Sequence, residues 1–197
     1  GNLFGTGVNA LDGVYVYPGG AVIDTTNLNV TANVSLQAPL GNGVASITLA
    51  PRDGYIGPPF VTISGTGVGA TALAQFDSQS GFVTGVTITS PGRDFTGVPS
   101  VTLSGGGTNL QTTVTGVTLA PNASGGLTKQ GSGTLTLNGT NTYGGATTLE
   151  NGTLKIAHAL ALPGASTVTF AGGTLDLSGM TLTNAVNVTG YFPSHFF

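Results

Sequence analysis

Two Arg-Asp pairs have the clearest capacity for chemistry in this chain. They are Arg52-Asp53 and Arg93-Asp94, and each is followed closely by an aromatic residue, Tyr55 or Phe95. Guanidinium groups bind carboxylates in a fixed, forked geometry, and aromatic rings offer a large apolar face. One hypothesis is therefore a carbohydrate-binding or polysaccharide-lyase-like cleft formed by Arg52, Tyr55, Arg93 and Phe95.

The same residues also have a purely structural interpretation, which we favour. An Asp side chain in a turn accepts hydrogen bonds from nearby backbone amides, and an Arg side chain can lie over an aromatic ring. Both pairs lie next to Gly and Pro, as turns commonly do. On this interpretation the pairs recur because the turn recurs.

The other residues form no recognisable catalytic, metal or cofactor motif. His158 and His195 have no carboxylate or second histidine at ligand spacing, the chain has no cysteine, and no serine lies in a Gly-x-Ser-x-Gly motif. The glycine-rich stretches lack the lysine and following helix of a phosphate-binding loop. We therefore expect a protein that is not an enzyme and that has no catalytic, metal-binding or cofactor-binding residues.

Composition narrows the remaining functions. Of 197 residues only 6% are charged and the net charge is -3, so no basic stripe is present for nucleic acid. No run of about 18 apolar residues occurs, so we expect no transmembrane segment. With 39% hydrophobic residues and little charge, the chain is expected to fold.

Short alternating runs of apolar and hydroxyl residues predict β-strands along nearly the whole chain. Examples are "VTI" at 61–63, "VTIT" at 86–89 and "VTL" at 101–103. Alternation with a period of two is typical of strands with one buried face. Clusters of Gly, Pro and Asn separate the runs and indicate sharp turns.

A short repeat in the last third of the chain predicts a stack of coils. Gly133-Thr134-Leu135-Thr136-Leu137 recurs from Gly152 and again from Gly173, at spacings of 19 (133 to 152) and 21 (152 to 173) residues. About twenty residues is the length of one coil of a parallel β-solenoid. In such a stack Leu135, Leu154 and Leu175 share one interior column, and Lys155 and Asp176 are outward-facing neighbours. Hairpins in a β-sandwich are the rival architecture, because Asn-Gly pairs also form hairpin turns.

A longer repeat occupies the middle of the chain. "PRDGYIGPPFVTISGTG" at 51–67 matches "PGRDFTGVPSVTLSGGG" at 91–107, at an offset of 40 residues. This offset equals about two solenoid coils, but for this section a solenoid and a sandwich both remain open. The predicted organisation is an N-terminal β segment at 1–43, two β repeats of about 40 residues at 44–120, a repeat solenoid at 121–190 and an aromatic tail at 191–197.

Residues 125–156 closely resemble the autotransporter-associated β-strand repeat of bacterial passenger proteins. The resemblance rests on Gly126-Leu127-Thr128-Lys129, Gly133-Thr134-Leu135-Thr136-Leu137, Asn141-Thr142-Tyr143, Gly145 and Gly152-Thr153-Leu154. It implies a right-handed parallel β-helix and export to the outer-membrane surface or beyond. The predicted fold is therefore an all-β, right-handed parallel β-helix, in which the middle of the chain is a less regular β-rich section. It implies no catalytic residue. A leader removed before this numbering begins is expected.

Passengers of this kind normally precede a β-barrel translocator, for which the chain has no room before Phe197. Two expectations therefore stand: a processed passenger fragment, or a free-standing extracellular protein that uses the same repeat.

The last residues of the chain are unusually aromatic. Tyr191, Phe192, Phe196 and Phe197 would either cap the last coil or dock onto a second copy. We thus expect an extracellular structural module that associates with itself as a filament or surface-fibre subunit, or that serves as a passenger segment. The alternatives are the carbohydrate site described above, with a surface polysaccharide as partner, and an adhesin.

Overall fold

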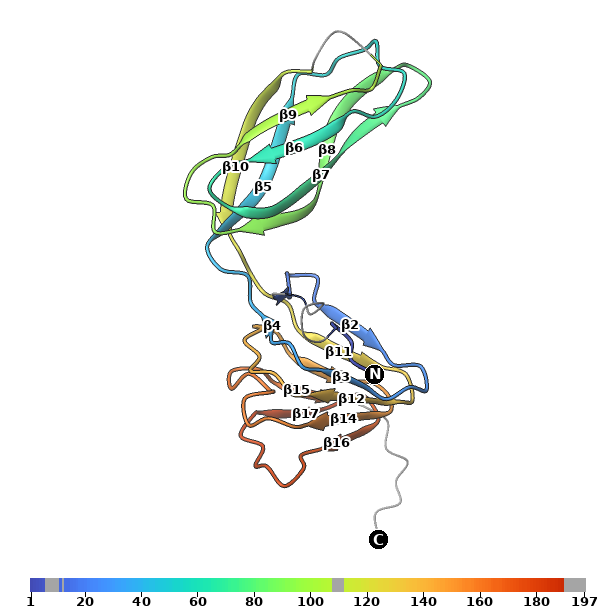
Figure 1. Cartoon of the computed structure of the whole chain (residues 1–197), viewed down its shortest axis with the longest axis vertical. Helices are drawn as coiled ribbons and strands as arrows, with labels where there is room; N and C mark the ends of the chain where they lie inside the picture. Colours follow the sequence, from blue (N-terminus) through green and yellow to red (C-terminus); the bar gives the residue numbers. More distant parts are fainter. Residues whose placement is uncertain (6–10, 12, 108–111, 190–197) are drawn as a thin grey trace. The chain divides into compact units, whose positions relative to one another are not determined.

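The computed structural model describes residues 1–5, 11, 13–107 and 112–189, and these residues contain strands and turns but no helix. The chain forms two compact units (Figure 1). One consists of Gly1–Pro39 together with Ala123–Phe197, and the other is Leu40–Asn122. Each unit has its own hydrophobic core.

The first unit is a β-solenoid. Its strands form two parallel sheets, in the orders β17-β15-β13-β11-β2 and β16-β14-β12-β3, and the chain alternates between the sheets as it advances. The strands are β2 (Ala21–Asp24), β3 (Val30–Ala32), β11 (Leu127–Gln130), β12 (Thr134–Leu137), β13 (Thr147–Leu149), β14 (Thr153–Ile156), β15 (Val168–Phe170), β16 (Thr174–Asp176) and β17 (Val186–Val188). Two further short strands, β1 (Val14–Tyr15) and β4 (Leu36–Gln37), pair in parallel with each other.

The parallel register aligns like residues in columns, as the repeat predicted. Leu135 pairs with Leu154, and Leu154 with Leu175, while Val30 extends the same column on the other side. Leu135 and Leu154 are fully buried. Burying a leucine side chain contributes about 1.5–3 kcal/mol, so each coil is stabilised by the interior column of its neighbours. The predicted all-β solenoid is confirmed.

The N-terminal residues belong to this solenoid and do not form the separate segment expected for residues 1–43. Strand β2 pairs with β11, and β3 pairs with β12, both in parallel. The reason is that inward-facing and outward-facing residues of "AVID" and "VTA" alternate in the same order as those of the repeat strands, so the two segments form one more coil. They do so although the whole Leu40–Asn122 unit separates them from β11 in the sequence. The boundaries fall after Pro39 and after Asn122.

The second unit is built from antiparallel strands, so in this section stacked coils are excluded. Its two sheets have the orders β10-β5 and β8-β7-β6-β9. Residues from both sheets, among them Val44, Val83 and Leu103, pack in one core. The strands are β5 (Asn42–Leu49), β6 (Phe60–Ser64), β7 (Val68–Asp77), β8 (Phe82–Arg93), β9 (Ser100–Ser104) and β10 (Val114–Pro121).

The offset of 40 residues has a different cause from the one expected. Strands β6 and β9, which are equivalent in the two repeats, pair antiparallel with each other, and Thr62 faces its own repeat equivalent Thr102. Equivalent turns also share a backbone conformation, because Gly54 and Asp94 both have positive φ angles, of 87° and 61°. The unit is therefore two copies of one strand-and-turn motif related by an internal twofold arrangement.

We predict that residues 40–122 fold on their own. The unit has a separate core, and its two ends are joined because the Asn122 backbone N–H donates to the Gly41 carbonyl at 2.9 Å. The isolated fragment should show β-type circular dichroism and one cooperative urea transition. A fragment without a cooperative transition would contradict this independence.

Candidate functional site

The residues that carry the family resemblance line the interior and the corners of the solenoid. The most unusual is Lys129, which is fully buried. In the register of the sheet it lies between Ile23 and Leu149, both buried and apolar, so a cation occupies an interior position of a hydrophobic column. Burying an ammonium group is costly unless hydrogen-bond acceptors surround it.

Three backbone carbonyls accept hydrogen bonds from the Lys129 ammonium. They belong to Gln130, Gly131 and Asn151, at 2.6, 2.7 and 3.1 Å from Nζ. The first two lie in the corner of its own coil, and the third lies in the corner of the next. Lys129 thus uses all three of its donors to fasten two consecutive corners together. Burial lowers the pKa of Lys129, and the carboxylate of Asp24 opposes that shift.

A second buried polar residue, Asn141, joins coils in a similar way. Its Oδ1 accepts from the Leu36 backbone N–H at 2.7 Å, and its Nδ2 donates to the Ala161 carbonyl at 2.6 Å. The partners lie on either side of Asn141 in the stack, so one side-chain amide bridges three successive layers. A fully paired buried amide of this kind stabilises one register over the alternatives.

Tyr143 completes this set of buried motif residues. Its ring is 1% exposed, and its hydroxyl shares a hydrogen bond of 2.6 Å with Thr147 Oγ1. Burial raises the pKa of Tyr143 to about 12, although the hydrogen bond to Thr147 acts in the opposite direction.

The glycines of the motif allow the corners of neighbouring coils to touch. Gly152 has a φ angle of 69°, and a Cβ atom there would lie 2.4 Å from the carbonyl oxygens of Gly131 and Gly133. A Cβ atom on Gly126 would lie 2.0 Å from the Ala146 carbonyl oxygen. No side chain fits at such separations, so the motif positions encode close stacking of backbones.

The predicted outward pair is also present. Lys155 and Asp176 are register partners, and their charged groups are 3.5 Å apart with both side chains over 40% exposed (44% and 42%). The pKa of Asp176 is lowered, mainly by the hydrogen bond from the Ser178 backbone N–H and to a smaller extent by Lys155. An exposed pair of this kind contributes little to stability.

The residues of the hypothetical carbohydrate cleft do not come together. Arg52 bridges to Val83 at the start of β8, whereas Arg93 ends the same strand. Since β8 has twelve residues, about 30 Å separates its two ends. Tyr55 and Phe95 are only 5% and 3% exposed, so neither ring offers a face to a sugar.

The two Arg-Asp turns have structural contacts of their own. Asp94 forms an ion pair with its neighbour Arg93, and its backbone N–H donates to the Leu40 carbonyl. The hydroxyl of Tyr55 accepts from the Thr112 backbone N–H at 2.9 Å. At the offset of 40 residues Asp94 corresponds to Gly54, so the two pairs lie one position apart in their turns. The interpretation of the pairs as recurring turns stays a prediction.

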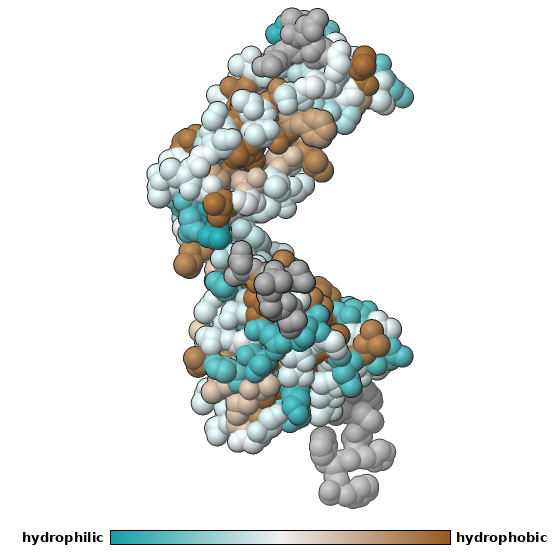
Figure 2. All heavy atoms as spheres, in the orientation of Figure 1, coloured by the Kyte–Doolittle hydropathy of each residue, from teal (hydrophilic) through white to brown (hydrophobic). Residues whose placement is uncertain are grey.

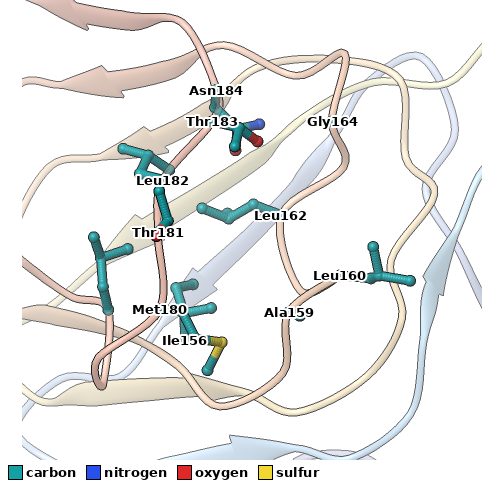
Figure 3. Close-up of a pocket in the computed structure, with 11 residues that line it drawn as sticks. Ile156, Ala159, Leu160, Leu162, Gly164, Met180, Thr181, Leu182, Thr183 and Asn184 are labelled. Carbon is teal, nitrogen blue, oxygen red and sulfur yellow. The ribbon is translucent and has the colours of Figure 1, made fainter.

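Both ends of the solenoid expose interior positions. Within the described residues, β16 and β17 have no strand on their outer side, and Val186 and Val188 are 52% and 53% exposed. Beside this end Leu162, Met180 and Leu182 surround a small cavity of about 90 Å³ (Figure 3). At the opposite end Phe4, Ile23 and Leu36 line an apolar hollow of about 350 Å³.

Other predicted residues have no role that the structure describes. The aromatic residues Tyr191, Phe192, Phe196 and Phe197 lie outside the described residues, as does His195. Nδ1 of His158 accepts a hydrogen bond from the Leu160 backbone N–H at 3.1 Å. In the described ranges no group of three or more His, Cys, Asp or Glu side chains is placed to hold a metal ion, and no helix is long and apolar enough to cross a membrane.

Comparison with known proteins gives one match. Residues 127–156 match a family model described as passenger-associated-transport-repeat. No curated protein and no solved structure matches the chain. The matched stretch runs from β11 to the end of β14, and together with the solenoid it fits a passenger-type repeat protein of the autotransporter class. That family suggests a surface or secreted protein.

We predict that Lys129→Met lowers the free energy of unfolding by about 2–3 kcal/mol. Methionine fills the column but removes the donor to the Gly131 and Asn151 carbonyls, while the Gln130 carbonyl keeps its bond from the Thr25 backbone N–H. We expect this loss to outweigh the relief of burying a charge. Urea denaturation measures the effect, with Lys155→Met as the matched control because Lys155 is exposed. Equal stabilities of the two variants would contradict the proposed role of Lys129.

We predict a loss of stability at alkaline pH that depends on Tyr143. In the unfolded chain its hydroxyl titrates near 10.0, whereas the folded chain keeps the proton up to about 12. This contribution to stability is therefore fully present below pH 10 and is lost as pH rises toward 12. By linkage it amounts to roughly 2–3 kcal/mol.

Urea denaturation at pH 9 to 12 tests this dependence. The wild-type curve should fall more steeply above pH 10 than that of Tyr143→Phe, which has no proton to lose. Parallel curves for the two proteins would show that Tyr143 is not responsible.

Proposed function

We propose that this chain is an extracellular structural module without catalytic activity. In this proposal the solenoid is a rod, and the Leu40–Asn122 unit is an insertion in the sequence between β4 and β11. The observation that supports the proposal best is the use of the passenger-repeat residues. Lys129, Asn141, Tyr143 and the corner glycines all serve the stacking of coils. Their contacts involve backbone and neighbouring side chains, and they require no substrate, metal or cofactor.

We further propose that copies associate end to end. The inward positions Val186 and Val188 of β17 continue the two columns that begin at Ala21 and Ile23 of β2. If β17 of one copy pairs in parallel with β2 of the next, the columns of this sheet continue across the junction. Exposed strand edges are templates for such pairing, and a contact between two different surfaces propagates without closing.

The sequence-based expectation for the aromatic residues after β17 can be tested together with this junction. Tyr191, Phe192, Phe196 and Phe197 would either cover β17 or bind the next copy. The two roles have opposite consequences for a chain that ends at Thr189. Removing a cap should promote association, whereas removing a docking segment should weaken it.

Association is tested with the full chain and two lysine variants. We expect sedimentation velocity to show concentration-dependent growth, and electron microscopy to show rods longer than one solenoid. Val188→Lys should abolish growth, since stacking would bury its charge. Asn187→Lys is the matched control, because this neighbouring residue faces outward with Thr169.

A wild-type chain that stays strictly monomeric at high concentration would exclude a filament or fibre subunit. Growth that is equally sensitive to both lysine variants would show that another surface is responsible. In either case the solenoid could still serve as a passenger segment, which the stability of the coils supports independently.

A further inference from the structure

The outer face of the four-stranded sheet in the Leu40–Asn122 unit consists largely of hydroxyl side chains. Alternate residues of its strands point away from the core and are exposed, while their neighbours are buried or half-buried. The central members of this hydroxyl face are Thr62, Thr71, Thr87, Thr89, Thr102 and Ser104.

Several of these groups are held in place by one another. Thr71 Oγ1 and Thr89 Oγ1 are 2.7 Å apart, and Gln75 Nε2 donates to Thr87 Oγ1 at 2.9 Å. Thr62 and Thr102 are direct register partners. The face therefore presents an ordered set of donors and acceptors across strands spaced by about 4.8 Å.

Two large apolar side chains lie within the hydroxyl face. Phe60 of β6 is 79% exposed and Leu73 of β7 is 66% exposed, and the two are register partners, so they lie side by side. Thr87 follows Leu73 on one side, and Ser104 follows Phe60 on the other. An exposed apolar pair with a polar rim is typical of a binding surface.

The centre of the face carries no charged side chain, and the exposed Asp77 lies at its edge. In the four strands the charged residues are Asp77 and Arg93, which are the last residues of β7 and β8. The visible surface of this unit is mostly pale, with brown apolar patches (Figure 2). A partner that matches this face carries no net charge, has many hydroxyl groups and has apolar patches of the size of one ring.

We propose that this face binds a neutral polysaccharide. A pyranose ring has an apolar face of C–H groups, which packs on Phe60 and Leu73, and a rim of hydroxyls, which exchange hydrogen bonds with the threonines and Gln75. Because the face is an open sheet surface, it suits a polymer chain. The face includes none of Arg52, Tyr55, Arg93 and Phe95, which the sequence suggested for a carbohydrate site, and the proposal does not depend on association of the solenoid.

The test is a binding measurement with the full chain on defined glycans. The neutral probes are cellulose, β-1,4-mannan and α-1,4-glucan, and the charged probe is alginate. We expect binding to at least one neutral glycan, little effect of salt on it, and weaker binding to alginate. The double variant Phe60→Ala and Leu73→Ala should bind about tenfold more weakly, because it removes both apolar contacts and a tenfold loss corresponds to about 1.4 kcal/mol.

The matched control is Val98→Ala, another exposed apolar residue (67%) that lies outside the strands of this sheet. It should bind like the wild type, and all three proteins should have the same circular dichroism, because none of the altered side chains is buried. The sedimentation of the double variant should equal that of the wild type.

Three outcomes would overturn the proposal. One is the absence of binding to every neutral glycan, or binding that the double variant retains in full. A second is a preference for alginate. The third is a change of oligomeric state in the double variant, which would identify the face as a contact between copies of the chain.

Discussion

Parallel, in-register pairing of one coil with the next is the constraint on which the rest of the solenoid depends. It places equivalent residues directly above one another, so a side chain must fit its own position and the same position in both neighbouring coils. Leucine columns satisfy this requirement by burying apolar area, as Leu135 and Leu154 do. The corners satisfy it where glycines, such as Gly152 and Gly126, let two backbones approach.

Lys129 shows how the same constraint admits a charge. Its long apolar stem replaces a leucine in the column, while the ammonium reaches the corner, where it donates to the turn carbonyls of Gly131 and Asn151 and to the Gln130 carbonyl at the end of β11. One side chain thus fills a buried apolar position and supplies hydrogen-bond donors to backbone carbonyls. Asn141 meets a similar demand between Leu36 and Ala161. Repetition of a motif is therefore a consequence of stacking and needs no ligand to explain it.

The sequence was most informative where the repeat is local. A period near twenty residues predicted the column of Leu135, Leu154 and Leu175 and the pair of Lys155 with Asp176. The coil formed by β2 and β3 was missed because its partners lie beyond the Leu40–Asn122 unit. The offset of 40 residues was misleading, since twofold pairing of β6 with β9 and two stacked coils give the same spacing. Burial of Tyr55 and Phe95 depends on nonlocal packing, which alternation alone does not reveal.

The stacking of coils can be tested most directly by nuclear Overhauser effects between backbone protons. The account predicts cross-peaks of the parallel type that connect Thr136 with Lys155 and Lys155 with Asp176, as successive steps of one ladder. Strong Hα–Hα contacts between Leu149 and Leu154 would instead indicate a hairpin at Asn151-Gly152. That result would contradict the solenoid and with it the structural role assigned to the motif.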